Sequence, residues 1–201
     1  MHPASTALVH PCTSTDGCTG RFWEGRFKCQ ALLDEAALLT CMTYVDLNPI
    51  RAKMADTPET SDFTSIQARI REHTTQKASK QNGNPNPESK VLPLSHFLES
   101  EHEDNPDGIP FSYADYLQLV DWTGRAVRDD KAGYIPQEIA PILERLNLNK
   151  EQWVDNIKHY DSRFKRVVGA LDIILNYSKA INQQWCHGQG AMRQLYNTLA
   201  T

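Results

Sequence analysis

Hydrophobic side chains between residues 34 and 48 recur at three- and four-residue intervals, which is the spacing of one face of an α-helix. Asp34 precedes this pattern and can cap the first turn, because its carboxylate can accept hydrogen bonds from free backbone N–H groups. Pro49 is expected to end the helix at Asn48, since the residue before a proline is biased away from helical backbone. The face predicted to be buried comprises Leu38, Cys41, Met42 and Val45, with Leu39 as a further candidate.

The rest of the chain carries several more helical patterns. A short helix is predicted over residues 61–72, and longer amphipathic patterns predict helices at residues 112–128, 136–146, 149–159, 163–182 and 191–199. In the first of these longer helices, the buried face is expected to hold Tyr116, Leu119, Val120, Thr123 and Val127.

Two stretches depart from the helical period. Aromatic and polar residues alternate between residues 21 and 30, which indicates one extended strand. Residues 73–88 contain almost no apolar side chains and are rich in Lys, Asn, Pro and Ser, as is typical of a flexible linker. The chain is therefore predicted to be mostly α-helical.

Composition adds few constraints to this picture. A length of 201 residues allows one or two small domains, and an apolar fraction of 40% can support a modest core. There is no apolar run of about eighteen residues and no charged start followed by an apolar block, so we expect a cytoplasmic protein without membrane segments. Five cysteines without paired spacing favour reduced thiols.

Charge limits how the chain could bind nucleic acid. The net charge of -4 gives no overall attraction to DNA, so any contact must come from a local basic patch. The candidate DNA-binding residues nearest the first helix are Arg21, Arg26, Lys28, Arg51 and Lys53. Further candidates in the second half are Arg125, Arg128, Lys131, Arg163, Lys165 and Arg166. All of them could equally be solvated surface charges, and Arg51 and Lys53 would suit a helix C-terminus in any case.

The most specific feature is the pairing of Tyr44 and Asn48, which lie four residues apart and so share one helix face. They belong to a longer pattern, in which Phe22-Trp23-Glu24 is followed by Tyr44 and then by Asn48-Pro49-Ile50-Arg51-Ala52. This pattern resembles the single-tyrosine HUH transposases, in particular the REP-associated tyrosine transposases and their longer relatives. The segment GIPFSYADYLQLVDWTGRAVRDDKAGYI resembles the helical tail of those longer relatives.

The resemblance implies a chemistry for the tyrosine helix. Tyr44 would be the nucleophile that attacks a phosphodiester of single-stranded or hairpin DNA and forms a phosphotyrosine link. Asn48 would supply one oxygen ligand to a magnesium or manganese ion that two histidines also hold, and the protein could act as a homodimer in the transposition of a mobile element.

One half of that site has no counterpart in the sequence. His2 and His10 do not form the family's paired-histidine strand motif, and residues 1–16 match nothing in the family. A single carboxamide cannot hold a hard cation that wants about six ligands. We therefore expect a truncated transposase-like protein that retains Tyr44 but does not cleave DNA on its own, unless another polypeptide supplies the histidines.

The resemblance also implies a domain organisation. Residues 1–16 would be an unmatched segment, 17–72 a partial catalytic domain, 73–92 a flexible linker, and 93–201 a helical C-terminal region. The expected fold class is mostly α, with the remnant of an α+β transposase catalytic domain, namely one strand plus the tyrosine helix, before the helical region.

One alternative follows from the residues themselves, and one open question follows from the resemblance. The chain could be a non-catalytic helical interaction module, in which Tyr44 is a half-buried tyrosine on an amphipathic helix. Without a full sheet to cover them, Leu38, Met42 and Val45 would either be covered by the helical region folding back or stay exposed as an apolar patch.

Overall fold

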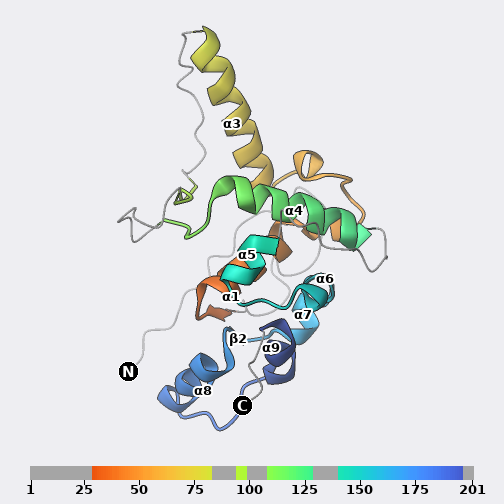
Figure 1. The fold of residues 1–201 in the computed structure, drawn as a ribbon. Helices are drawn as coiled ribbons and strands as arrows, with labels where there is room; N and C mark the ends of the chain where they lie inside the picture. Colours follow the sequence, from red (N-terminus) through yellow and green to blue (C-terminus); the bar gives the residue numbers. More distant parts are fainter. Residues whose placement is uncertain (1–28, 83–93, 99–107, 129–139, 197–201) are drawn as a thin grey trace, which may run out of the picture.

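The computed structural model describes residues 29–82, 94–98, 108–128 and 140–196 (Figure 1). Within these residues the fold is mostly helical, as predicted, with one two-stranded parallel sheet. The helices are α1 (Glu35–Asp46), α2 (Asn48–Arg51), α3 (Ser65–Asn82), α4 (Tyr113–Arg128), α5 (Ala140–Arg145), α6 (Lys150–Lys158), α7 (Tyr160–Arg163), α8 (Leu171–Ala180) and α9 (Gln189–Leu195). The strands are β1 (Ala31–Leu32) and β2 (Val167–Val168), and η2 (Pro58–Thr60) is a short 3₁₀ helix.

The first helix begins where the sequence predicts and ends slightly earlier. Asp34 has extended backbone and its Oδ1 accepts a 2.7 Å hydrogen bond from the Ala37 N–H, which confirms the N-cap. Helix α1 ends at Asp46, so Asn48 is the first residue of α2 rather than the last residue of α1. Proline at position 49 cannot continue α1, because it has no N–H and its ring would clash with the carbonyl four residues back.

The buried face of α1 differs from the predicted one. Val45, expected to be buried, is 51% exposed, and Leu38, Cys41 and Met42 are only partly buried. The residues that α1 buries are Ala36, Ala37, Leu39, Thr40, Thr43 and Asp46. Asp46 can occupy this face because neighbouring elements donate hydrogen bonds to its carboxylate, which a hydrophobic pattern does not reveal.

The C-terminal half folds back over the N-terminal half. The Tyr116 hydroxyl on α4 donates a 2.6 Å hydrogen bond to Asp46 on α1, and Ala31 of β1 pairs in parallel register with Val167 of β2. Helix α4 buries the five side chains that the sequence predicts for it. The C-terminal helices therefore cover most of α1, which is the first of the two alternatives. Val45 stays exposed, as the second alternative expects.

The predicted linker is partly helical. Helix α3 continues through Asn82, well beyond the predicted end at residue 72, and projects from the rest of the fold in Figure 1. Residues 73–82 are therefore helical, whereas 83–92 lie outside the described residues. Gln, Lys and Ala make up five of the six residues 76–81 and are good helix formers, which favours a helix there.

Two other predictions are corrected. The single helix predicted over residues 163–182 is interrupted by β2, because the β-branched Val167 and Val168 pair with β1. The strand predicted at residues 21–30 lies outside the described residues as far as residue 28, and β1 follows it at Ala31–Leu32.

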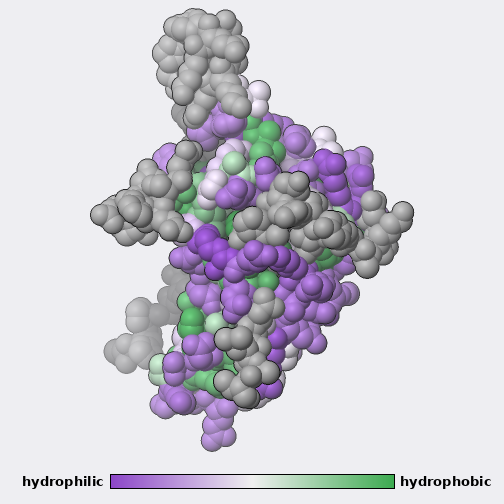
Figure 2. All heavy atoms as spheres, in the orientation of Figure 1, coloured by the Kyte–Doolittle hydropathy of each residue, from purple (hydrophilic) through white to green (hydrophobic). Residues whose placement is uncertain are grey.

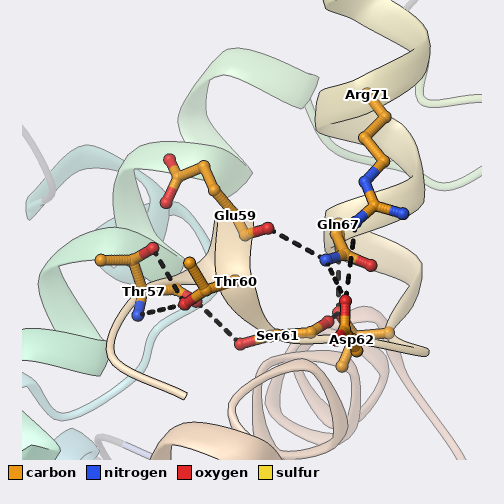
Figure 3. A network of polar contacts seen from close by, with 8 residues as sticks. Thr57, Glu59, Thr60, Ser61, Asp62, Gln67 and Arg71 are labelled. Atoms are coloured by element: carbon orange, nitrogen blue, oxygen red, sulfur yellow. Dashed lines mark hydrogen bonds and ion pairs between the residues drawn. The ribbon is translucent and has the colours of Figure 1, made fainter.

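A dense polar network shapes the turn between η2 and α3 (Figure 3). The Gln67 side-chain amide donates to the Glu59 carbonyl at 3.0 Å and to Asp62 Oδ1 at 2.8 Å. Arg71 forms an ion pair with Asp62 at 3.5 Å. This network holds Phe63 in left-handed backbone, with φ of 64° and a fully exposed side chain.

The surface of the described part mixes hydrophilic and hydrophobic side chains on the face that Figure 2 presents. Of the helices described, none has the length and apolar content needed to cross a bilayer.

Candidate functional site

Tyr44 lies in the last part of α1 and packs against another aromatic ring. Its side chain is half-buried, and its ring stacks on that of Tyr160 in α7, with ring centres 4.5 Å apart and planes inclined by 24°. Tyr160 in turn contacts Phe164 at 5.0 Å between ring centres. Because Tyr160 is remote in sequence, the surroundings of Tyr44 are formed jointly by both halves of the chain.

Arg51 joins the two residues of the sequence motif. Its guanidinium carbon lies 4.3 Å from the centre of the Tyr44 ring, and its Nη1 donates a 3.1 Å hydrogen bond to Asn48 Oδ1. Its Nη2 donates to the backbone carbonyl of Lys158 at 3.1 Å. Tyr44 and Asn48 therefore meet at one place on the surface, although they belong to different helices.

The remaining predicted site residues have different fates. Lys53 is exposed directly after α2, with left-handed backbone at φ of 57°. Arg21, Arg26 and Lys28 lie outside the described residues.

Gln30 fixes the position of Tyr160. The Tyr160 hydroxyl donates to Gln30 Oε1, and the Gln30 amide donates to the carbonyls of Phe164 at 3.1 Å and Lys165 at 3.3 Å. Burial raises the pKa of Tyr160 well above its usual value, and the neighbouring Cys41 raises it further. Tyr160 is therefore a neutral hydrogen-bond donor rather than a source of phenolate. The sequence does not single out Tyr160 or Gln30 as site residues, because neither belongs to the tyrosine motif and their contact joins distant positions.

The described residues do not fit a magnesium or manganese ion at Asn48. Its Oδ1 accepts a hydrogen bond from the positively charged Arg51, which would repel a cation at that oxygen. In the part of the chain that the structure describes, no group of three or more His, Cys, Asp or Glu side chains could hold a metal. No chemical step through a metal follows from this arrangement.

A second polar centre supports the same helix from inside. Asp46 is 1% exposed, and its carboxylate accepts hydrogen bonds from Tyr116, from Ser65 Oγ at 2.7 Å and from the Ile66 N–H at 3.1 Å. Burial raises the pKa of Tyr116 well above its usual value, and Asp46 adds to this effect. The centre joins α1, α3 and α4, and so fixes the end of α1 from which Tyr44 projects.

Comparison with known proteins yields no match: no protein-family model, no curated protein and no solved structure is similar to this chain at a significant level. A functional assignment must therefore rest on the residues of the chain and on their geometry.

Proposed function

We propose that this chain is a DNA-binding protein of transposase ancestry, which holds single-stranded or hairpin DNA at Tyr44 and does not cut it by itself. The observation that supports this proposal is the position of Arg51, which brings Tyr44 and Asn48 together at the junction of α1 and α2. The motif in the sequence and the cluster in the fold contain the same three residues.

Arg51 keeps donors available for a phosphate. A guanidinium has five N–H groups, and the two hydrogen bonds to Asn48 and to the Lys158 carbonyl occupy two of them. The remaining groups could donate to phosphate oxygens in the forked geometry that arginine favours. Lys53 is exposed nearby in sequence and would add a second positive charge.

Strand cleavage is not proposed for this chain alone. A phenol with a reference pKa near 10 needs help to ionise at neutral pH. No hydrogen bond within the described residues involves the Tyr44 hydroxyl, so no base accepts its proton there. A metal site beside Asn48 would require both histidines from a second polypeptide and release of Asn48 Oδ1 from Arg51.

The test is binding of a fluorescent hairpin DNA, followed by anisotropy over a range of salt concentrations. We expect binding that weakens steeply with salt, because phosphate contacts release counterions, and we expect Arg51→Gln to weaken it. Lys179→Gln, which removes an exposed charge on α8, is the matched control and should bind as the unmodified protein does. Salt-independent binding, or none, would contradict the proposal.

A second assay addresses cleavage. The protein is incubated with hairpin DNA and manganese, and covalent protein–DNA adducts are sought by denaturing electrophoresis. We expect none. An adduct that disappears in Tyr44→Phe would show that the single chain is a nuclease after all.

The second candidate is a non-catalytic helical interaction module. It is favoured by the apolar side chains that α8 and the following turn leave exposed, namely Ile173, Leu175, Ile181 and Trp185. Such groups suit contact with a protein partner rather than with phosphates. If this candidate is correct, Trp185→Ala should abolish partner binding, while Arg51→Gln should leave it unchanged.

A further inference from the structure

The fold separates five of the six candidate DNA-binding residues of the C-terminal half into two groups, and the sixth, Lys131, lies outside the described residues. Arg125 forms an ion pair with Asp121 at 2.8 Å, Arg128 pairs with Asp56 at 3.4 Å, and Arg163 pairs with Asp155. Lys165 and Arg166 are exposed and have no carboxylate partner among the described residues. Exposed cations without an acidic partner are the ones available to a phosphate.

The backbone that carries these two residues is held firmly. The Gln30 side chain donates to the Lys165 carbonyl, and the Ala31 N–H donates to the Arg166 carbonyl at 2.8 Å. Arg166 immediately precedes β2, which pairs with β1. The Lys165 ammonium also donates to the Asp161 carbonyl. The backbone at both residues is therefore held by bonds at the edge of the sheet rather than lying in a free loop.

The same contacts connect this basic pair to Tyr44. Gln30 accepts from Tyr160, Tyr160 stacks on Tyr44, and Arg51 reaches the carbonyl at the end of α6, immediately before α7. The intervening segment, residues 158–166, holds two Lys, two Arg and one His against the single acid Asp161. Since Asp155 lies within ion-pair distance of both Arg163 and His159, the positive charge of this segment that can reach a phosphate is that of Lys165 and Arg166, on a chain of net charge -4.

We propose that Lys165 and Arg166 extend the DNA site, so that a single strand bound at Arg51 continues across the turn between α7 and β2. This inference rests on the proposed function and adds to it a direction for the strand and two phosphate contacts. The partner is a single-stranded nucleic acid, because the only helix within residues 158–166 that carries these contacts is the four-residue α7, which is too short to enter a major groove.

The experiment compares two double variants that remove the same charge. One is Lys165→Gln with Arg166→Gln, and the control is Arg125→Gln with Lys179→Gln, all at exposed positions. The probe is a fluorescent single-stranded DNA of about twenty nucleotides, a length that exceeds one binding site of about 4–16 nucleotides. Circular dichroism and thermal melting verify that both variants fold.

For two lost phosphate contacts, the slope of log K against log salt should fall by about 1.4, which corresponds to about 25-fold weaker binding at about 0.1 M salt. The control should change the affinity by less than about twofold, since Arg125 already pairs with Asp121 and Lys179 lies on α8, outside residues 158–166. Equal weakening in both double variants, or no change in either, would overturn the inference, while the effect of Arg51→Gln would still support the proposed function. Failure of the unmodified protein to bind would overturn both.

Discussion

The guanidinium of Arg51 lies over the ring of Tyr44, with its central carbon 4.3 Å from the ring centre. This contact links α2 to α1 across the break at Leu47, and the hydrogen bond from Arg51 to the Lys158 carbonyl links both helices to α6. The same side chain that could contact a phosphate thus also stabilises the place where the two halves meet.

Replacing Arg51 should therefore affect stability as well as binding. Arg51→Gln loses a cation–π contact worth about 0.5–1 kcal/mol and two hydrogen bonds worth about 1 kcal/mol each, so we expect a loss of about 2–3 kcal/mol. Arg125→Gln, which breaks an exposed ion pair, should cost less than about 1 kcal/mol. Urea unfolding, followed by tryptophan fluorescence, measures the free energy of unfolding of both variants. Equal losses of this free energy would argue against a structural role for Arg51.

The hydrogen bonds at Asp46 predict that stability falls further as more of them are removed. Tyr116→Phe removes one buried hydrogen bond to a carboxylate and should cost about 1.5–3 kcal/mol. Asp46→Ala should cost more, because Ser65, Ile66 and Tyr116 all lose their acceptor. Tyr177→Phe on α8 is the control, and its unfolding free energy in urea should stay within about 0.5 kcal/mol of the unmodified protein.

Two glycines near α9 provide a matched pair. Gly188 has φ of 98°, and a Cβ there would lie 2.7 Å from the Arg163 carbonyl oxygen, so Gly188→Ala should destabilise by about 1–3 kcal/mol. Gly190 is helical with open space around it, so Gly190→Ala should be neutral or stabilise by up to about 1 kcal/mol. The melting temperature should fall for Gly188→Ala and should not fall for Gly190→Ala. Equal decreases in the two variants would contradict this geometry.

The left-handed backbone at position 63 predicts that glycine can replace Phe63 without loss of stability. Left-handed backbone costs an L-residue about 1–2 kcal/mol, whereas glycine adopts it freely. Since the Phe63 side chain is fully exposed, Phe63→Gly should leave the stability unchanged or raise it by about 1 kcal/mol. Gln194→Gly, at an exposed helical position on α9, should instead lose about 1 kcal/mol in urea unfolding.

Stability should fall in alkaline solution. Burial raises the pKa of Tyr196 above its usual value, and the hydrogen bond from its hydroxyl to Asp34 at 2.7 Å raises it further. A raised pKa in the folded state gives stability that is complete below the unfolded pKa near 10 and is lost as pH rises, by about 1.4 kcal/mol per pH unit for each such tyrosine. Unfolding free energies measured between pH 8 and 11 should show this decline.

The matching variant is Tyr196→Phe. It should be less stable than the unmodified protein at pH 8, because Asp34 loses a donor, and its stability should decline less steeply above pH 10. A decline of the same steepness in both proteins would show that Tyr196 does not contribute.

The sequence by itself determined the elements whose information is local. The Asp34 cap, the interruption at Pro49 and the buried face of α4 could all be read from neighbouring residues, because caps, proline sterics and helical periodicity act over a few positions. The predicted site residues Tyr44, Asn48 and Arg51 also came from one short segment.

Only the tertiary structure decided what surrounds those residues. Val45 was predicted to be buried and is exposed, while Asp46 is buried, because Tyr116, Ser65 and Ile66 supply hydrogen bonds that no local pattern encodes. The stacking of Tyr160 on Tyr44 and the pairing of β1 with β2 join residues more than a hundred positions apart. Contacts at such separation depend on how the whole chain packs, so periodicity in the sequence cannot specify them.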